Sequence, residues 1–224
     1  KRTIWGGQRI ASYKGVSVDA DNIGESWEIS AVGGSESVVS EGDERNLGIS
    51  QLIDRHRGSL VGEKVYRRFG NEFPLLVKFI DAASDLSIQV HPDDTLAYAR
   101  HGGRGKSEMW YVLDAAPGAG LYSGLKDSLS PAEYAAAVSD HTIADHLCHY
   151  DVKPGDCFYL PPGRIHSIGA GTFLVEIQET SDITYRIYDF NRRDADGNLR
   201  QLHTDLAADA IEYCVEKDYR THYT

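Results

Sequence analysis

One stretch, residues 153–170, constrains the fold of this chain more than any other. Its skeleton is Gly155, five residues, Pro161, one residue, Gly163, two residues and His166. A turn leads into a short apolar strand at 157–160, and a Pro-Pro-Gly corner follows that strand. Because such turns fix the backbone at both ends of a strand, we expect His166 to project from a rigid support. Whether it is a packed core residue or a ligand depends on the partners that the rest of the chain supplies.

A second predicted strand, 86–91, carries three polar side chains on one face. Ser87, Gln89 and His91 are each two residues apart. Alternate side chains of a strand point in the same direction. This face is therefore either turned to solvent or turned toward a polar site.

Glu108 lies in the next predicted strand, 106–113, on the same face as Lys106. Together, His91, Glu108 and His166 offer imidazole and carboxylate, which borderline divalent metals prefer. Two histidines and one carboxylate leave coordination positions open for water or substrate, as a catalytic metal requires. A structural zinc usually has four protein ligands, often cysteines. The pattern therefore predicts a catalytic rather than a structural metal site.

The glycine-proline pattern that ends at His166 resembles the second motif of the cupin superfamily, whose members are jelly-roll barrels with a metal in the mouth. Two positions depart from the simple cupin pattern. Ala170 stands where the motif has asparagine, and Gln89-Val90-His91 stands where the first motif usually has His-x-His. Glu108 also lies further from the first motif than in simple cupins.

Several segments resemble type I mannose-6-phosphate isomerase, most closely the short bacterial form of that family. They are Trp5-Gly6-Gly7, Gly24-Glu25-Ser26-Trp27-Glu28-Ile29-Ser30, Gln89-Val90-His91-Pro92, Lys106-Ser107-Glu108-Met109-Trp110 and Tyr185-Arg186-Ile187-Tyr188-Asp189. The similarity extends over almost the whole chain, with the motifs in the family's order and spacing. Short-form members normally continue into a second, smaller β domain, whereas this sequence stops at Thr224. The missing initial methionine favours a truncated chain over a shortened member.

The resemblance implies a zinc-dependent interconversion of mannose 6-phosphate and fructose 6-phosphate through an enediolate, with one Zn²⁺ per chain. The metal ligands would be His91, Glu108 and His166, with Gln89 matching a fourth ligand of the longer members. Arg186 matches the residue usually taken as catalytic. The resemblance also places Ser87, Lys106 and Arg186 in the substrate pocket.

Aldose–ketose isomerisation needs an electrophile for the developing oxyanion, a base, and a group that holds the phosphate. Arg186 suits the enediolate or the phosphate because it is permanently charged. Lys106 suits phosphate as a point charge, or proton transfer if burial lowers its pKa. The base stays open between Lys106, a metal-bound water and His101.

Two other functions are compatible with these residues. Two histidines and one glutamate also form the ligand set of non-haem iron oxygenases, so a cupin dioxygenase is one alternative. A non-catalytic, sugar-phosphate-binding cupin is the other. Metal identity and oxygen uptake would separate the first alternative from an isomerase, and binding without turnover would indicate the second.

Composition limits the partners and the location. The 224 residues include 34 acidic and 23 basic side chains, for a net charge of −11. This balance argues against non-specific nucleic-acid binding or docking on an anionic membrane. Neither a signal peptide nor a transmembrane run is predicted. Three cysteines without CxxC spacing, Cys148, Cys157 and Cys214, favour reduced thiols in a cytoplasmic protein. We also expect a monomer or a weak homodimer.

The expected fold is one all-β-dominated domain over 1–224, a cupin jelly-roll barrel with a small helical insert and short flanking helices. The insert near 128–149 comprises a helix that Pro131 and Glu133 open, and a second helix at 143–149. One or two short helices are expected within 46–68, another that starts at 93–95 and precedes a glycine loop, and a further one at 206–211. A turn is expected at 194–197. Further strands are expected at 73–80, 172–178 and 184–189.

Overall fold

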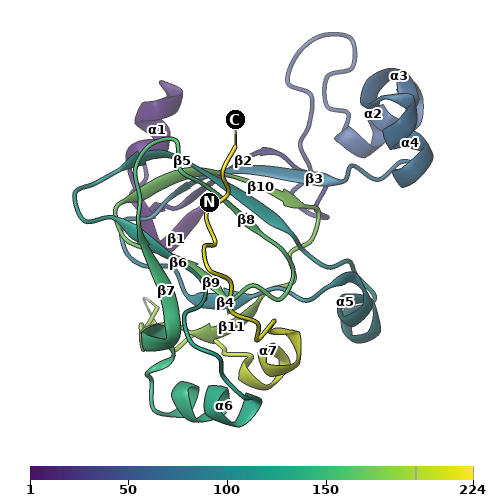
Figure 1. The fold of residues 1–224 in the computed structure, drawn as a ribbon. Coiled ribbons are helices and arrows are strands. Elements are labelled where there is room, and N and C mark those ends of the chain that lie inside the picture. The colour runs from purple at the N-terminus through teal and green to yellow at the C-terminus, as the bar shows by residue number, and fades with distance from the viewer. Residues whose placement is uncertain (195, 224) are drawn as a thin grey trace.

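Two five-stranded antiparallel sheets pack face to face and form the body of the protein (Figure 1). The computed structural model describes residues 1–194 and 196–223. The first sheet consists, in spatial order, of β2 (Glu25–Ile29), β3 (Leu75–Asp81), β10 (Thr172–Glu179), β5 (Glu108–Ala115) and β8 (Cys157–Leu160). The second consists of β11 (Tyr185–Tyr188), β4 (Ile88–Val90), β9 (His166–Ile168), β6 (Gly120–Leu125) and β7 (Leu147–Asp151). A further strand, β1 (Arg2–Gly7), is joined to the first sheet by isolated bridges.

The first sheet turns charged as well as apolar side chains toward the second. Buried residues alternate along its central strands: Leu76, Lys78 and Ile80 in β3; Leu174, Glu176 and Gln178 in β10; Glu108, Trp110 and Val112 in β5. Antiparallel pairing sets Glu176 opposite Lys78 on one side and Trp110 on the other. Since side chains of a strand alternate between its faces, these charged groups lie inside the protein together with the core.

Apolar side chains of both sheets meet between them. Ile80, Trp110, Phe158 and Leu174 from the first sheet contact Leu121 and Ile168 from the second. The outer face of the second sheet is covered by α6 (Pro131–Ser139) and α7 (Thr204–Ala210), which lie below it in Figure 1. The second sheet is therefore buried on both faces, which holds its short strands in place.

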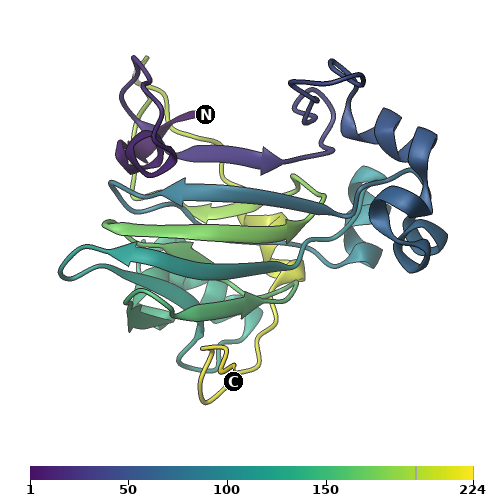
Figure 2. The same cartoon turned by 90° about the horizontal axis from the view of Figure 1, so that it is seen from above.

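The remaining helices lie around the sheets. They are α1 (Arg9–Lys14), α2 (Ile49–His56), α3 (Gly58–Val61), α4 (Glu63–Phe69), α5 (Asp94–His101) and the 3₁₀ turn η1 (Ile143–His146). Figure 2 places α2–α4 together at one end of the first sheet and α1 at the opposite end. None of the helices in the described residues is long and apolar enough to cross a membrane.

The predicted helices at 46–68, 93–95 and 206–211 correspond to α2–α4, α5 and α7, and the predicted strands at 73–80, 172–178 and 184–189 to β3, β10 and β11. Helix α6 begins where predicted. The hydroxyl of Ser130 accepts a hydrogen bond from the backbone N–H of Glu133, and the carboxylate of Glu133 accepts one from the backbone N–H of Ser130.

The structure corrects two of the predictions about the fold and leaves a third untested. The prediction of a second helix at 143–149 is wrong beyond residue 146. Residues 143–146 form a 3₁₀ turn, and 147–151 form strand β7. Pairing with β6 recruits this segment into the sheet, which overrides a weak local preference. The expected jelly-roll barrel is confirmed only as two antiparallel sheets, which share no strand in the described residues and so do not close into one barrel. The predicted turn at 194–197 includes Ala195, which lies outside the described residues.

The Pro-Pro-Gly corner at 161–163 joins the segments that carry two of the predicted ligands. Gly163 has φ +84° and donates its backbone N–H to the carbonyl of His91 over 2.9 Å. A Cβ on Gly163 would lie 3.0 Å from the carbonyl oxygen of Ala210. Both the left-handed backbone and this close approach require glycine.

We predict that Gly163→Ala destabilises the protein more than Gly42→Ala. Both positions have positive φ, but a Cβ at Gly42 meets nothing within 4 Å. The left-handed backbone costs about 1–2 kcal/mol in each variant, and only Gly163→Ala adds crowding against Ala210. Urea unfolding measures the two free energies, and equal losses would show that the corner tolerates a side chain.

Candidate metal centre

His91, Glu108 and His166 converge between the two sheets, at the ends of β4, β5 and β9. One ligand atom from each lies within 4.8 Å of the others. Nε2 of His91 is 3.2 Å from Oε1 of Glu108, and Nε2 of His166 is 3.6 Å from its Oε2. All three side chains are at most 2% exposed. The structure thus brings together the three residues that the sequence predicts as ligands.

Backbone carbonyls orient both imidazoles. Nδ1 of His91 donates to the carbonyl of Ile183 over 2.9 Å, and Nδ1 of His166 donates to that of Arg164 over 2.7 Å. A carbonyl only accepts hydrogen bonds, so the proton of each neutral ring lies on Nδ1. Each Nε2 is left with its lone pair toward Glu108, as in histidines that bind metals.

Several polar atoms of this cluster lack hydrogen bonds. Nε2 of His91 and both carboxylate oxygens of Glu108 are buried and have no hydrogen-bond partner among the described residues. The ammonium of Lys106 approaches Oε1 of Glu108 to 2.6 Å, outside hydrogen-bond geometry. Unpaired buried polar atoms are costly. A divalent cation would accept these lone pairs, so the residues fit a metal.

The surroundings set the protonation states that a metal needs. Burial, reinforced by the charge of Lys106, lowers the pKa of His91 to about 4. Burial likewise lowers the pKa of His166, although Glu108 opposes the shift. For Glu108, burial raises the pKa, but Lys106 and then His91 outweigh it and hold the pKa well below its usual value. Neutral imidazoles and an ionised carboxylate are the forms that coordinate metals.

A cavity of about 310 Å³ reaches Glu108 and is lined by four more of the predicted residues: Ser87, Gln89, Lys106 and Arg186. The amide nitrogen of Gln89 lies 3.3 Å from Nε2 of His166. Ser87 and Lys106 are buried, at 4% and 5% exposure. His91 and His166 are not among the residues that line the cavity, so of the three clustered side chains only Glu108 reaches it.

The cavity wall carries charges of both signs, and its two arginines are Arg186 and Arg200. Arg192 and Arg200 share the carboxylate of Asp189. Arg186 adds a third guanidinium, which donates to the carbonyl of Gln201 over 2.8 Å. Burial, and then the charge of Arg200, lower the pKa of Arg186. Arg186 has no carboxylate partner among the described residues, so its guanidinium is available to an anionic ligand.

Sequence reasoning missed a buried ion pair in the same cavity. Nζ of Lys78 is 2.8 Å from Oε1 of Glu176, whose Oε2 accepts from the indole of Trp110 over 3.0 Å. That indole packs edge-on to His166, with 5.3 Å between ring centroids. A lysine inside an otherwise apolar strand was a usable signal, but its partner lies 98 residues away.

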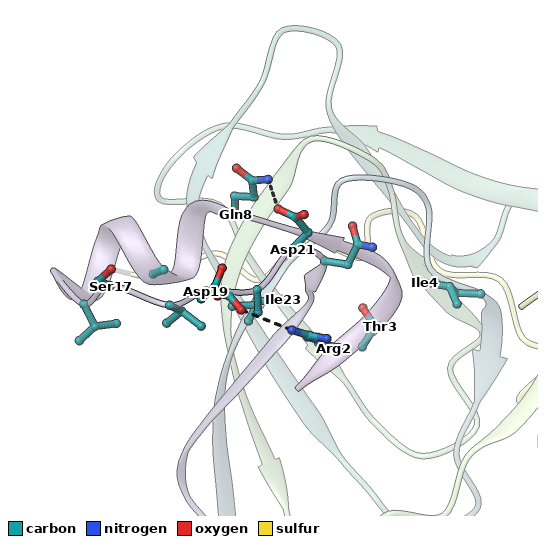
Figure 3. Close-up of a pocket in the computed structure, with 13 residues that line it drawn as sticks. Arg2, Thr3, Ile4, Gln8, Ser17, Asp19, Asp21 and Ile23 are labelled. Carbon is teal, nitrogen blue, oxygen red and sulfur yellow. Dashed lines mark hydrogen bonds between the residues drawn. The ribbon is translucent and has the colours of Figure 1, made fainter. Parts of the chain in front are cut away.

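Two other cavities lie apart from the His91–Glu108–His166 cluster. His101 lies in a separate cavity of about 410 Å³ with Tyr185 and His203, and Nε2 of His101 is 2.9 Å from the hydroxyl of Tyr185. A larger cavity, about 890 Å³, lies beside β1 and α1 (Figure 3). Its wall includes Gln8 bonded to Asp21 but no histidine. Size alone therefore does not locate the chemistry.

The fold and the site define a two-sheet antiparallel β protein with a candidate metal centre at a cavity of mixed charge. Residues 1–114 match the family model described as phosphomannose isomerase type I, catalytic domain. The chain is 38% identical over 213 residues to mannose-6-phosphate isomerase ManA of Bacillus subtilis, and 37% identical over 214 residues to mannose-6-phosphate isomerase of Streptococcus mutans. This chain belongs to the type I phosphomannose isomerase family.

The relatives are longer than this chain. The alignments cover 95% and 94% of the chain but 65% of each relative. The crystal structure of mannose 6-phosphate isomerase from Bacillus subtilis superimposes with a TM-score of 0.88 at 34% identity, over 98% of this chain and 68% of that one. The chain thus spans about two thirds of the proteins it resembles.

We predict that Glu108→Gln abolishes metal binding while the fold survives. The amide keeps the shape but loses the charge that draws the cation, and the loss should exceed the about 10–100-fold typical of groups that only orient ligands. Metal content after dialysis, measured by mass spectrometry, tests this.

The control is Glu25→Gln, which alters another carboxylate in the cavity wall outside the cluster. It should retain the metal. Normal metal content in Glu108→Gln would remove Glu108 from the ligand set.

Proposed function

We propose that this chain is the catalytic domain of a mannose-6-phosphate isomerase, interconverting mannose 6-phosphate and fructose 6-phosphate with one Zn²⁺. The observation that carries the proposal is the buried His91–Glu108–His166 cluster, with unpaired lone pairs, at a cavity that Arg186 and Arg200 also line. Family membership supports the reaction. Gln89 would add a fourth ligand if its amide oxygen turned toward the cluster.

The proposed reaction moves a proton between neighbouring carbons through an enediolate. A bound zinc ion would supply Lewis acidity toward the substrate's carbonyl and hydroxyl oxygens. Lys106 would hold or move a proton, since its ammonium lies beside Glu108 in the cavity wall. Ser87 would orient a substrate hydroxyl. The separate location of His101 makes it a poorer candidate for the base than Lys106.

The proposed phosphate site is the arginine-rich part of the wall. The guanidinium of Arg186 has no carboxylate partner among the described residues. Arg200 shares the single carboxylate of Asp189 with Arg192, so only one of these two positive charges is neutralised. Guanidinium groups bind phosphate oxygens in pairs. A dianionic sugar phosphate would therefore lie between Arg186 and the metal cluster.

We propose further that the two sheets are the halves of a cupin jelly roll, that 1–224 forms one catalytic domain, and that the protein works in the cytoplasm as a monomer or weak homodimer. Free thiols at the three cysteines are compatible with that location. A dioxygenase is the weaker alternative, because the arginine-rich wall suits a phosphorylated substrate. A non-catalytic sugar-phosphate-binding protein remains the alternative if turnover needs further domains.

The first test is a coupled assay for fructose 6-phosphate formed from mannose 6-phosphate. We expect turnover by the purified chain, its loss with a chelator, and its recovery with Zn²⁺. Oxygen uptake with Fe²⁺ and no isomerisation would favour the dioxygenase. Binding of fructose 6-phosphate without turnover would favour the non-catalytic alternative.

The second test is Arg186→Ala. Losing charged hydrogen bonds to the substrate should lower kcat/KM for mannose 6-phosphate by about 100-fold, with metal content unchanged. If Arg186 holds the phosphate, the variant should also discriminate less between mannose 6-phosphate and mannose; if it stabilises the enediolate, both substrates should lose equally. Arg193→Ala is the control, because the exposed side chain of Arg193 bonds only the carbonyl of Gly197 among the described residues. Unchanged kinetics in Arg186→Ala would exclude both roles.

A further inference from the structure

Arg186 lies on a strand that has a sheet neighbour on only one side. β11 is the outermost strand of the second sheet and pairs with β4 alone. The outward N–H and C=O groups of an edge strand need other partners when they are shielded from water. The backbone of Arg186 finds both in one residue, His203, which lies 17 positions further along the chain.

His203 bonds the backbone of Arg186 twice. Its own N–H donates to the carbonyl of Arg186 over 2.7 Å, and its Nδ1 accepts from the N–H of Arg186 over 3.1 Å. The neighbouring Gln201 accepts from the Arg186 guanidinium over 2.8 Å. Residues 200–203, which we name the strap, thus fix both the backbone and the side chain of Arg186.

The strap is itself firmly attached. Arg200 at one end binds Asp189 on the loop after β11. His203 at the other end precedes α7, and its carbonyl accepts the first helical hydrogen bond, from Ala207. Helix α7 is tied in turn to Tyr134 of α6, whose hydroxyl donates to the carbonyl of Thr204 over 3.1 Å. The strap therefore links Arg186 to the helical layer.

We propose that His203 is a positioning residue: its imidazole Nδ1, by accepting the backbone N–H of Arg186, sets where the Arg186 guanidinium meets the substrate. The functional consequence rests on the proposed function, whereas the hydrogen bond does not. Only a neutral ring with its proton on Nε2 can accept at Nδ1. Burial, Arg186 and His101 lower the pKa of His203, which keeps it in that form.

A matched pair of substitutions at His203 separates the effect of its hydrogen bond to Arg186 from the effects of side-chain size and polarity. In His203→Asn, the side-chain oxygen attaches to the same carbon as Nδ1 and can accept the same N–H. In His203→Gln, the amide lies one bond further out and cannot. Exposed His222, which contacts only Asp218 among described groups, gives the control His222→Ala.

Hydrogen exchange of the Arg186 amide tests the bond without any substrate. We expect slow exchange in wild type and His203→Asn, and exchange about tenfold faster or more in His203→Gln, the factor that one modest hydrogen bond represents. Equal protection in the matched pair would overturn the assigned hydrogen bond. If His203→Gln does not fold, wild-type-like protection in His203→Asn still supports the bond, and its loss there refutes it.

Steady-state kinetics test the consequence. KM for mannose 6-phosphate should rise about tenfold in His203→Gln, stay within about threefold of wild type in His203→Asn, and not change in His222→Ala. Metal content should be the same in all. A wild type without isomerase activity would refute the proposed function alone. An active wild type with equal KM values in the matched pair would refute the positioning role alone.

Discussion

The buried carboxylate of Glu108 is the constraint on which the site depends. An ionised carboxylate inside a protein is costly unless cations or donors compensate it. Here Lys106 supplies charge at 2.6 Å, yet neither carboxylate oxygen has a hydrogen-bond partner among the described residues. Two neutral imidazoles present lone pairs rather than protons to the same space. The protein groups alone compensate the burial of these polar atoms poorly, whereas a divalent cation would compensate it well. This accounts for the meeting of three strand ends at one point.

The two sheets hold this centre through short, specific contacts rather than through one rigid element. Glu108 comes from the first sheet, whereas His91 and His166 come from neighbouring strands of the second. The N–H of Gly163 binds the carbonyl of His91, so the corner before His166 is attached directly to the other histidine. Two carbonyls then fix the imidazole rings. Arg186 is held similarly by the strap, from the side of the helical layer. The His91–Glu108–His166 cluster and Arg186 thus have separate supports beside one cavity.

The sequence was informative where spacing along one strand carries the signal. Ser87, Gln89 and His91 share a face because side chains alternate, and the glycine-proline corner predicted the presentation of His166. It was uninformative where a partner lies far along the chain. Lys78 stood out in an apolar strand, but Glu176 could be matched to it only through the β3–β10 register. The role of His203 could not be predicted, because nothing near it in the sequence indicates that it completes an edge strand. The helix predicted at 143–149 was wrong for 147–149, because β6 pairs with that segment, and α1 (Arg9–Lys14) was not predicted.

The central claim is that His91, Glu108 and His166 hold one catalytic metal ion. Anomalous X-ray scattering from crystals grown with Zn²⁺, measured on both sides of the zinc absorption edge, locates that ion directly. We predict a single strong peak within bonding distance, about 2.0–2.2 Å, of Nε2 of both histidines and an oxygen of Glu108. A peak elsewhere with none at this cluster, under conditions in which the protein isomerises mannose 6-phosphate, would contradict it.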